Sequence, residues 1–164
     1  MKSEWIQIRV SPELKERLRV VAQSRGVSLS KFIIDCVGGA EMNRYWVGGT
    51  GNWNDTSHWS ASSGGSGGAS VPTSNDDVFI DSNSGLSGGT ILVPYGDCNN
   101  LTCTSGHTYT IKEDDYGELY ISGSLELEPG ITWSSRLDLF FNGGGTIKTS
   151  GVKLGYVGIG AMLS

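Results

Sequence analysis

Long apolar runs, cysteine pairs and prolines are all scarce in this sequence. No apolar run reaches the roughly 18 residues that a transmembrane helix needs, so we expect no membrane partner. The charged segment that begins with Glu4 predicts no signal peptide, and we expect the chain to be made in the cytoplasm. Only four prolines and three cysteines occur among the 164 residues. Cys36, Cys98 and Cys103 form no CxxC motif, which argues against a zinc site and favours buried, reduced thiols.

Glycine is scarce in the first part of the chain, and the balance of charge changes sign at the same place. Only three of the 25 glycines lie in residues 1–41. That segment carries seven Lys and Arg against five Asp and Glu, whereas residues 42–164 carry five against twelve. We therefore predict two domains, a small basic head and an acidic body that repels nucleic acid.

The head begins with one half-buried strand. In "WIQIRV" the apolar residues Ile6, Ile8 and Val10 alternate with Trp5, Gln7 and Arg9. A single strand leaves both of its edges unpaired, and a segment of this length cannot bury a core alone. We expect residues 1–37 to fold only as a homo-oligomer, most simply a dimer.

Two helices follow the strand. "SPELKERLRVVAQSRG" has Ser11 as its N-cap, Pro12 at the first helical position and Gly26 just beyond the end. "SLSKFIIDCV" begins a second helix with Ser28 as its cap. Residues 38–41 then form a glycine hinge.

This order, with the patterns IxIRVSPELKERL and RGVSLSKFI, resembles the ribbon-helix-helix family, the β-ribbon class that includes Arc and MetJ. The resemblance implies that paired strands enter the DNA major groove while the second helix holds phosphate. The implied DNA-binding residues are Trp5, Gln7, Arg9, Ser28 and Lys31. The alternative is that the same residues form a solvated face or a protein-docking face.

The sequence of the body predicts short β-strands separated by turns. From Asp76 on, runs such as "DVFID", "TILV", "NLTC", "YTIK", "ELYIS", "SLELE", "ITW", "RLDLFFN" and "TIK" alternate with Gly, Asn, Asp and Ser. Segments such as "SGSLELEPGITW" and "NGGGTIKTSG" resemble copies of one unit. We predict an α+β chain in which residues 76–164 form a short, right-handed β-helix-like solenoid with roughly three turns before Gly151.

Aromatic residues gather ahead of this solenoid, in residues 42–75. "YWVGGTGNWNDTSHWS" holds Trp46, Trp53 and Trp59, and a Gly/Ser loop follows it. The end of a coil of strands must be covered, so we expect the three tryptophans to cap it. The alternative is that their rings stack on sugars.

Residues 44–150, with "YWVGGTGNW" and "VPTSNDDVFID" as the most specific parts, resemble β-solenoid regions of phage fibre and virion proteins and of bacterial surface passengers. The resemblance implies a phage virion accessory protein, a head decoration or short fibre, that joins other virion proteins through its head. Its location would be the virion, after assembly in the host cytoplasm. The alternative is a DNA-binding transcriptional regulator with a β appendage.

We expect no enzymatic activity, no cofactor and no metal. The candidate catalytic carboxylates are Asp76, Asp77, Asp81, Glu113, Asp114, Asp115 and Glu118. Glycosidases need two carboxyls across a cleft, and three turns make a short wall for an oligosaccharide. His58 and His107 have no nucleophile with a third orienting group nearby, and we expect both in turns or the cap.

The last segment, "GYVGIGAMLS", is apolar and contains no charged or aromatic plug like that at the front. We expect it to pack against another subunit, a neighbouring virion protein or its own last turn. The residues of this predicted C-terminal assembly surface are Tyr156, Val157, Ile159, Met162 and Leu163.

Overall fold

The computed structural model describes residues 11–24, 29 and 42–160. The chain divides into two compact units, Met1–Ala40 and Glu41–Ser164, which are described separately. The predicted N-terminal strand and nearly all of the predicted second helix lie outside the described residues. Of the predicted ribbon-helix-helix head, the structure describes the first helix and, from the predicted second helix, only Leu29.

Helix α1 spans Pro12–Ser24. The backbone N–H of Leu14 donates to Ser11 Oγ at 3.2 Å, so Ser11 is the N-cap, as predicted. Ala22 is buried, while Leu14 and Val20 are 43% and 58% exposed. No helix in the described part of the chain is long and apolar enough to cross a membrane.

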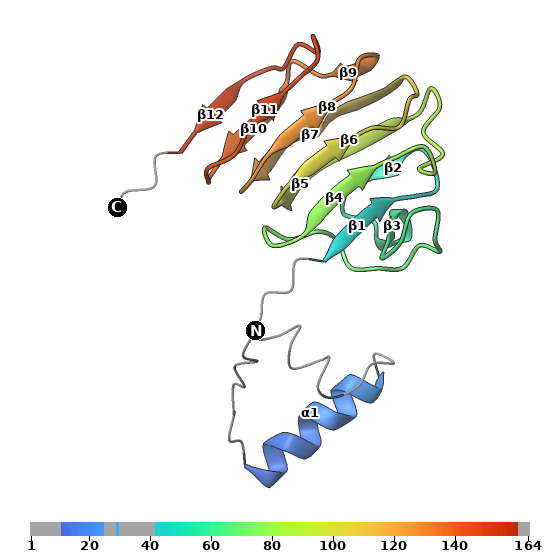
Figure 1. The fold of residues 1–164 in the computed structure, drawn as a ribbon, viewed down its shortest axis with the longest axis vertical. Coiled ribbons are helices and arrows are strands. Elements are labelled where there is room, and N and C mark those ends of the chain that lie inside the picture. Colours follow the sequence, from blue (N-terminus) through green and yellow to red (C-terminus); the bar gives the residue numbers. More distant parts are fainter. Residues whose placement is uncertain (1–10, 25–28, 30–41, 161–164) are drawn as a thin grey trace, which may run out of the picture. The chain divides into compact units, whose positions relative to one another are not determined.

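Residues 42–160 form a β-solenoid of about four turns (Figure 1). One sheet, sheet A, has the order β11-β8-β6-β4-β1-β3. Its strands are β1 (Asn43–Trp46), β3 (Trp59–Ser60), β4 (Asp77–Ile80), β6 (Leu101–Cys103), β8 (Leu125–Leu127) and β11 (Ile147–Lys148). All pairs are parallel except β1 with β3.

The second sheet, sheet B, has the order β12-β10-β7-β5-β2, and β9 also pairs with β7. Its strands are β2 (Gly51–Asn52), β5 (Thr90–Cys98), β7 (Tyr109–Ile121), β9 (Ile131–Trp133), β10 (Leu137–Phe141) and β12 (Val157–Ile159). A short 3-10 helix, η1 (Thr56–His58), precedes β3. Every sheet B pair is parallel, so each turn of chain stacks on the one before it.

The register places one residue from each turn in a column. Val78, Leu101, Leu125 and Ile147 are successive partners in sheet A. The spacing along this column agrees with the predicted turn of roughly 20 to 25 residues. Because side chains alternate in a strand, the first three of these residues point into one continuous apolar core, whereas Ile147 at the last turn is 45% exposed.

The segments of the body predicted as strands from Asp76 on all form strands, but the solenoid begins earlier than predicted. Its first strand is β1, which pairs in parallel with β4, and β2 pairs with β5. Residues 43–60 therefore cover the end of the solenoid and also supply its first turn. The sequence hides this because β1 and β2 are only four and two residues long.

Candidate binding face of the solenoid

The three tryptophans of the N-terminal segment fill the end of the solenoid core. Trp46, Trp53 and Trp59 are all fully buried. The ring of Trp59 lies edge-on to both others, with centroids 5.0 Å from Trp46 and 4.8 Å from Trp53. Such edge-to-face pairs stabilise beyond their buried area. No ring face of these residues is open to a sugar.

Hydrogen bonds and a close backbone approach hold this cap. Trp46 Nε1 donates to the carbonyl of Gly49 at 2.7 Å, and Trp59 Nε1 donates to that of Trp53 at 2.6 Å. His58 stacks on Trp46 with centroids 4.9 Å apart, so it is a residue of the cap. A Cβ at Gly96 would lie 2.9 Å from Trp53 Nε1, which is why glycine stands there.

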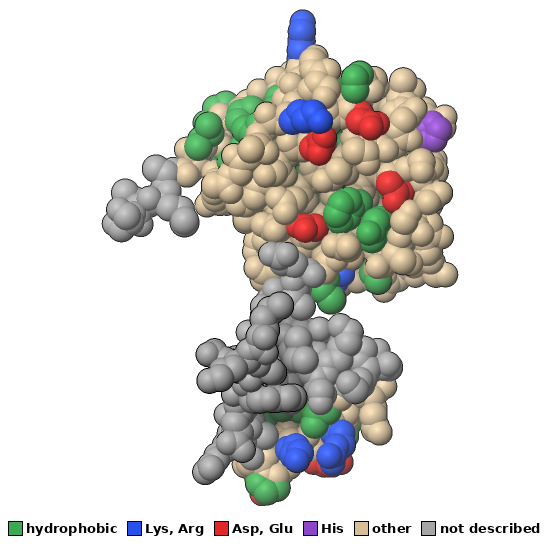
Figure 2. All heavy atoms as spheres, in the orientation of Figure 1, with side chains coloured by type: hydrophobic (Ala, Val, Ile, Leu, Met, Phe, Trp, Pro, Cys, Tyr) green, Lys and Arg blue, Asp and Glu red, His purple; other side chains and the backbone are tan. Residues whose placement is uncertain are grey.

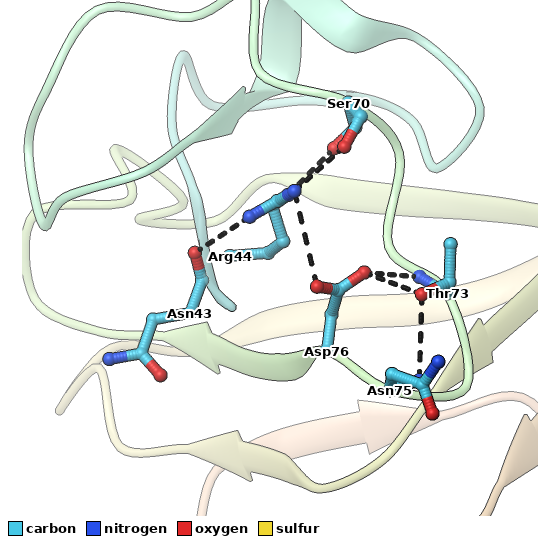
Figure 3. A network of polar contacts seen from close by, with 6 residues as sticks. All are labelled: Asn43, Arg44, Ser70, Thr73, Asn75 and Asp76. Carbon is cyan, nitrogen blue, oxygen red and sulfur yellow. Dashed lines mark hydrogen bonds and ion pairs between the residues drawn. The ribbon is translucent and has the colours of Figure 1, made fainter. Parts of the chain in front are cut away.

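A buried polar network joins the cap to the loop that crosses it (Figure 3). The Arg44 guanidinium donates to the carbonyl and hydroxyl of Ser70, at 3.1 and 2.8 Å. It also lies 3.9 Å from Asp76, with both side chains less than one-tenth exposed. The other oxygen of Asp76 accepts from the N–H and hydroxyl of Thr73. Asp76, a candidate catalytic carboxylate, therefore fastens the loop.

The other early carboxylates also have partners within the chain. Asp77 Oδ1 accepts from the amides of Asn99 and Asn100, at 3.0 and 2.7 Å. Asp81 Oδ1 accepts from the backbone N–H of Asn83 at 2.9 Å. The Asp77 bonds join one turn of the solenoid to the next, and the Asp81 bond forms a local turn, so both carboxylates have structural partners.

His107 lies in the turn before β7, where its backbone N–H donates to Ser105 Oγ at 3.2 Å. This placement agrees with the turn role predicted for it. Among the described residues, no group of three His, Cys, Asp or Glu side chains is arranged to hold a metal ion.

Cys98 and Cys103 are buried, free thiols, as predicted, on the successive strands β5 and β6 of the two sheets, and Cys36 lies outside the described residues. Burial raises the pKa of both thiols, that of Cys103 to about 12. Because the thiolate is the reactive form, we expect neither to react with a thiol reagent at neutral pH until the protein unfolds.

Alkylation followed by peptide mass spectrometry, with and without denaturant, measures this. Rapid labelling of Cys98 or Cys103 in the folded protein would contradict the prediction.

A row of aromatic and acidic side chains covers the outward side of the second half of sheet B, by which we mean the C-terminal parts of β5 and β7 together with β10 and β12. We call it the aromatic–acidic face, and its residues are Tyr95, Asp97, Glu118, Tyr120, Asp138, Phe140 and Tyr156. Stacked Tyr120 and Phe140 have centroids 4.9 Å apart, and Tyr95 and Tyr156 extend the row at 5.5 and 5.9 Å. Tyr95 and Tyr156 are 50% and 59% exposed.

Negative charge dominates the electrostatics of this face. Tyr120 donates its hydroxyl to Glu118 Oε2 at 3.0 Å, and this bond raises the pKa of Tyr120. Loss of water contact, followed by the hydrogen bond to Asp97, raises the pKa of Tyr95. The face cannot be recognised in the sequence because its residues come from four separate segments. The available clue was that Tyr120 and Phe140 alternate with buried residues in their strands.

A bulge borders this face. Between Val93 and Tyr95 the register of β5 shifts against β7, and residues 114–117 are left outside the pairing. Asp115 has φ of +61°, and Tyr116 is 90% exposed. Beside the bulge is a hollow of about 310 Å³, lined by Asp115, Tyr116, Gly117, Glu118, Arg136 and Asp138.

Contacts from distant turns hold the bulge in place. Asn52 in the first turn donates to Asp114 Oδ2 at 3.0 Å. From the fourth turn, Arg136 lies 3.5 Å from Glu113 and donates to the Asp115 carbonyl at 3.4 Å. The run "KEDDYGE", predicted as a solvated turn, is thus a bulge within one 13-residue strand.

The far end of the solenoid is partly open. Val157 packs against the core, while Tyr156 and Ile159 are 59% and 76% exposed. Met162 and Leu163 lie outside the described residues, as do Trp5, Gln7, Arg9, Ser28 and Lys31. The assembly role of the C-terminal residues and the DNA-binding role of the N-terminal residues remain predictions.

A model of the HicB family matches residues 3–37, a segment confined to the N-terminal unit. The matched family has an antitoxin fold of the ribbon-helix-helix kind, in agreement with the resemblance found in the sequence. No curated protein and no solved structure matches the chain.

Proposed function

We propose that this chain is a structural accessory protein of a phage virion, a head decoration or short fibre. Its N-terminal unit docks it, and its β-solenoid projects a fixed surface. The observation that carries the proposal is the division into a small unit and a separate solenoid whose first end is sealed by buried tryptophans. A capped solenoid presents its sides and its remaining end for contact.

The contacts of the acidic residues support a role in binding or assembly rather than catalysis. Asp76, Asp77 and Asp81 each accept hydrogen bonds that shape turns or fasten a loop. Glu113 and Asp114 hold the bulge. A glycosidase would need two of these carboxyl groups free on opposite sides of the substrate and roughly 5 to 10 Å apart.

A second candidate function is sequence-specific DNA binding, and the match of residues 3–37 to the HicB family favours it. In this proposal Gln7 and Arg9 contact bases, and Ser28 and Lys31 contact phosphate. The charge of the body disfavours DNA contact elsewhere. On the face that Figure 2 shows, Asp and Glu side chains are spread singly over the body.

The two proposals give different results in two measurements on the full chain. A structural accessory protein should oligomerise, and deleting residues 155–164 should weaken that assembly while the remaining solenoid stays folded. The physical reason is that the deletion removes exposed Ile159 and the open edge of β12, which we propose contact a second subunit. Sedimentation and circular dichroism measure both properties.

A regulator should instead bind duplex DNA with an affinity that falls steeply as salt rises, because each phosphate contact releases counterions. Arg9→Ala should then reduce binding. Salt-dependent DNA binding that Arg9→Ala abolishes, together with assembly unchanged by the deletion, would overturn the accessory role. Oligomers that need residues 155–164 and show no DNA binding would overturn the regulator.

A further inference from the structure

The outward side of the second half of sheet B differs in charge from the neighbouring sheet surfaces. The first half of sheet B presents a column of Thr90, Thr110 and Thr132 beside Lys112, and its carboxylate Glu113 is paired with Arg136. On sheet A, Glu126 is paired with Lys148 of the next turn. The second half of sheet B instead presents Asp97, Glu118 and Asp138, and its strands contribute no lysine or arginine.

Two of these carboxylates lie side by side. Glu118 of β7 and Asp138 of β10 are direct partners in the parallel register. Adjacent parallel strands are about 4.8 Å apart, and like charges placed opposite each other destabilise a sheet. Among the described residues neither carboxylate has an ion-pair partner, because the nearby Arg136 is ion-paired with Glu113. The face therefore carries a repulsion that a cation from outside would relieve.

The hollow beside this pair has the size and lining for one long cationic side chain. Its volume of about 310 Å³ is at the small end of the range for ligand pockets. Three carboxylates and one arginine line it, together with the ring of Tyr116. An aromatic ring accepts both the aliphatic stem of Lys or Arg and, over its face, the charge itself.

The aromatic row gives the same face the apolar content of a protein interface. Tyr95 and Tyr156 are half exposed or more, and Tyr120 and Phe140 stack between them. A Cβ at Gly158 would come within 2.7 Å of the Phe140 ring, so glycine is what lets the row continue into the last turn. Tyrosine is enriched at the centres of protein interfaces.

We propose that the aromatic–acidic face, with the hollow at its edge, binds a basic segment of another protein and seats an arginine or lysine side chain between Glu118, Asp138 and Tyr116. The match is one of charge and shape. Glu118 and Asp138, which have no ion-pair partner among the described residues, meet the cation, and the exposed rings cover its aliphatic stem. This inference stands apart from what the N-terminal unit binds.

The test uses the full chain and a synthetic peptide of alternating arginine and serine. The control is the same peptide with citrulline, which is uncharged, in place of each arginine. Calorimetry should detect the arginine peptide and show binding that weakens with salt. The double variant Glu118→Gln/Asp138→Asn should lose at least about tenfold in affinity. The control Glu126→Gln/Glu128→Gln removes the same charge elsewhere and should stay within about twofold.

A second readout separates binding from folding. Because the Glu118–Asp138 pair is repulsive, the double variant should melt at the same temperature as the parent or higher while binding less. Equal loss of affinity in both double variants would overturn the proposal, since it would show only the general acidity of the body. Three other results would also overturn it: equal binding of the citrulline peptide, binding of a neutral oligosaccharide in place of the peptide, or no peptide binding at low salt.

Discussion

Replacing Trp53 by alanine should lower the free energy of unfolding of the solenoid by about 3–5 kcal/mol. The side chain is fully buried and packs edge-on against Trp59. Its removal leaves a cavity at the end of the core, and the strands around it cannot collapse into the space without breaking their register. Chemical denaturation followed by circular dichroism measures the loss.

Tyr116→Ala is the matched control, because that aromatic side chain is 90% exposed. It should change the free energy of unfolding by no more than about 0.5 kcal/mol. If Trp53→Ala left stability unchanged and instead abolished binding to a polysaccharide, the cap role would be wrong and the sugar-stacking alternative right.

Asp76→Ala should destabilise the body by a similar amount, about 3–5 kcal/mol. The change leaves the guanidinium of Arg44 buried without its carboxylate, and it removes the acceptor for the N–H and hydroxyl of Thr73. Losing one partner of a buried ion pair costs more than the pair itself contributes, because the remaining charge stays desolvated.

A double-mutant cycle provides the control for this prediction. Arg44→Met alone should also destabilise, since the hydrogen bonds to Ser70 are lost. The double variant Arg44→Met/Asp76→Ala should cost clearly less than the two single losses added together, because no charge remains buried. Additive losses would show that the 3.9 Å contact between Arg44 and Asp76 contributes no coupling.

Much of the architecture follows from local sequence patterns. The alternation in segments such as "RLDLFFN" predicts a strand with one buried side, and Leu137, Leu139 and Phe141 are buried in β10. Ser11 and Pro12 predict the start of α1 for equally local reasons, a hydroxyl acceptor and a preset φ angle. Gly, Asn and Asp between the strands mark turns because they tolerate the backbone conformations that turns need.

The binding face could not be predicted in the same way. Tyr120 and Phe140 are twenty positions apart in the chain and become neighbours only because β7 and β10 pair in one register. A shift of β10 by one residue against β7 would turn Phe140 to the core side and separate the two rings. The Arg44–Asp76 contact likewise depends on the loop between them folding back across the cap.

The sequence by itself determined the strand segments, the helix cap, the aromatic cap segment and the unequal charge of the two units. These depend on residues close together in the chain, where alternation, capping and composition act directly. The tertiary structure alone decided where the solenoid starts, that the "KEDDYGE" run is a bulge, and which carboxylates lie side by side. Those features depend on pairing between turns about twenty residues apart, and that pairing is selected by the packing of the whole core.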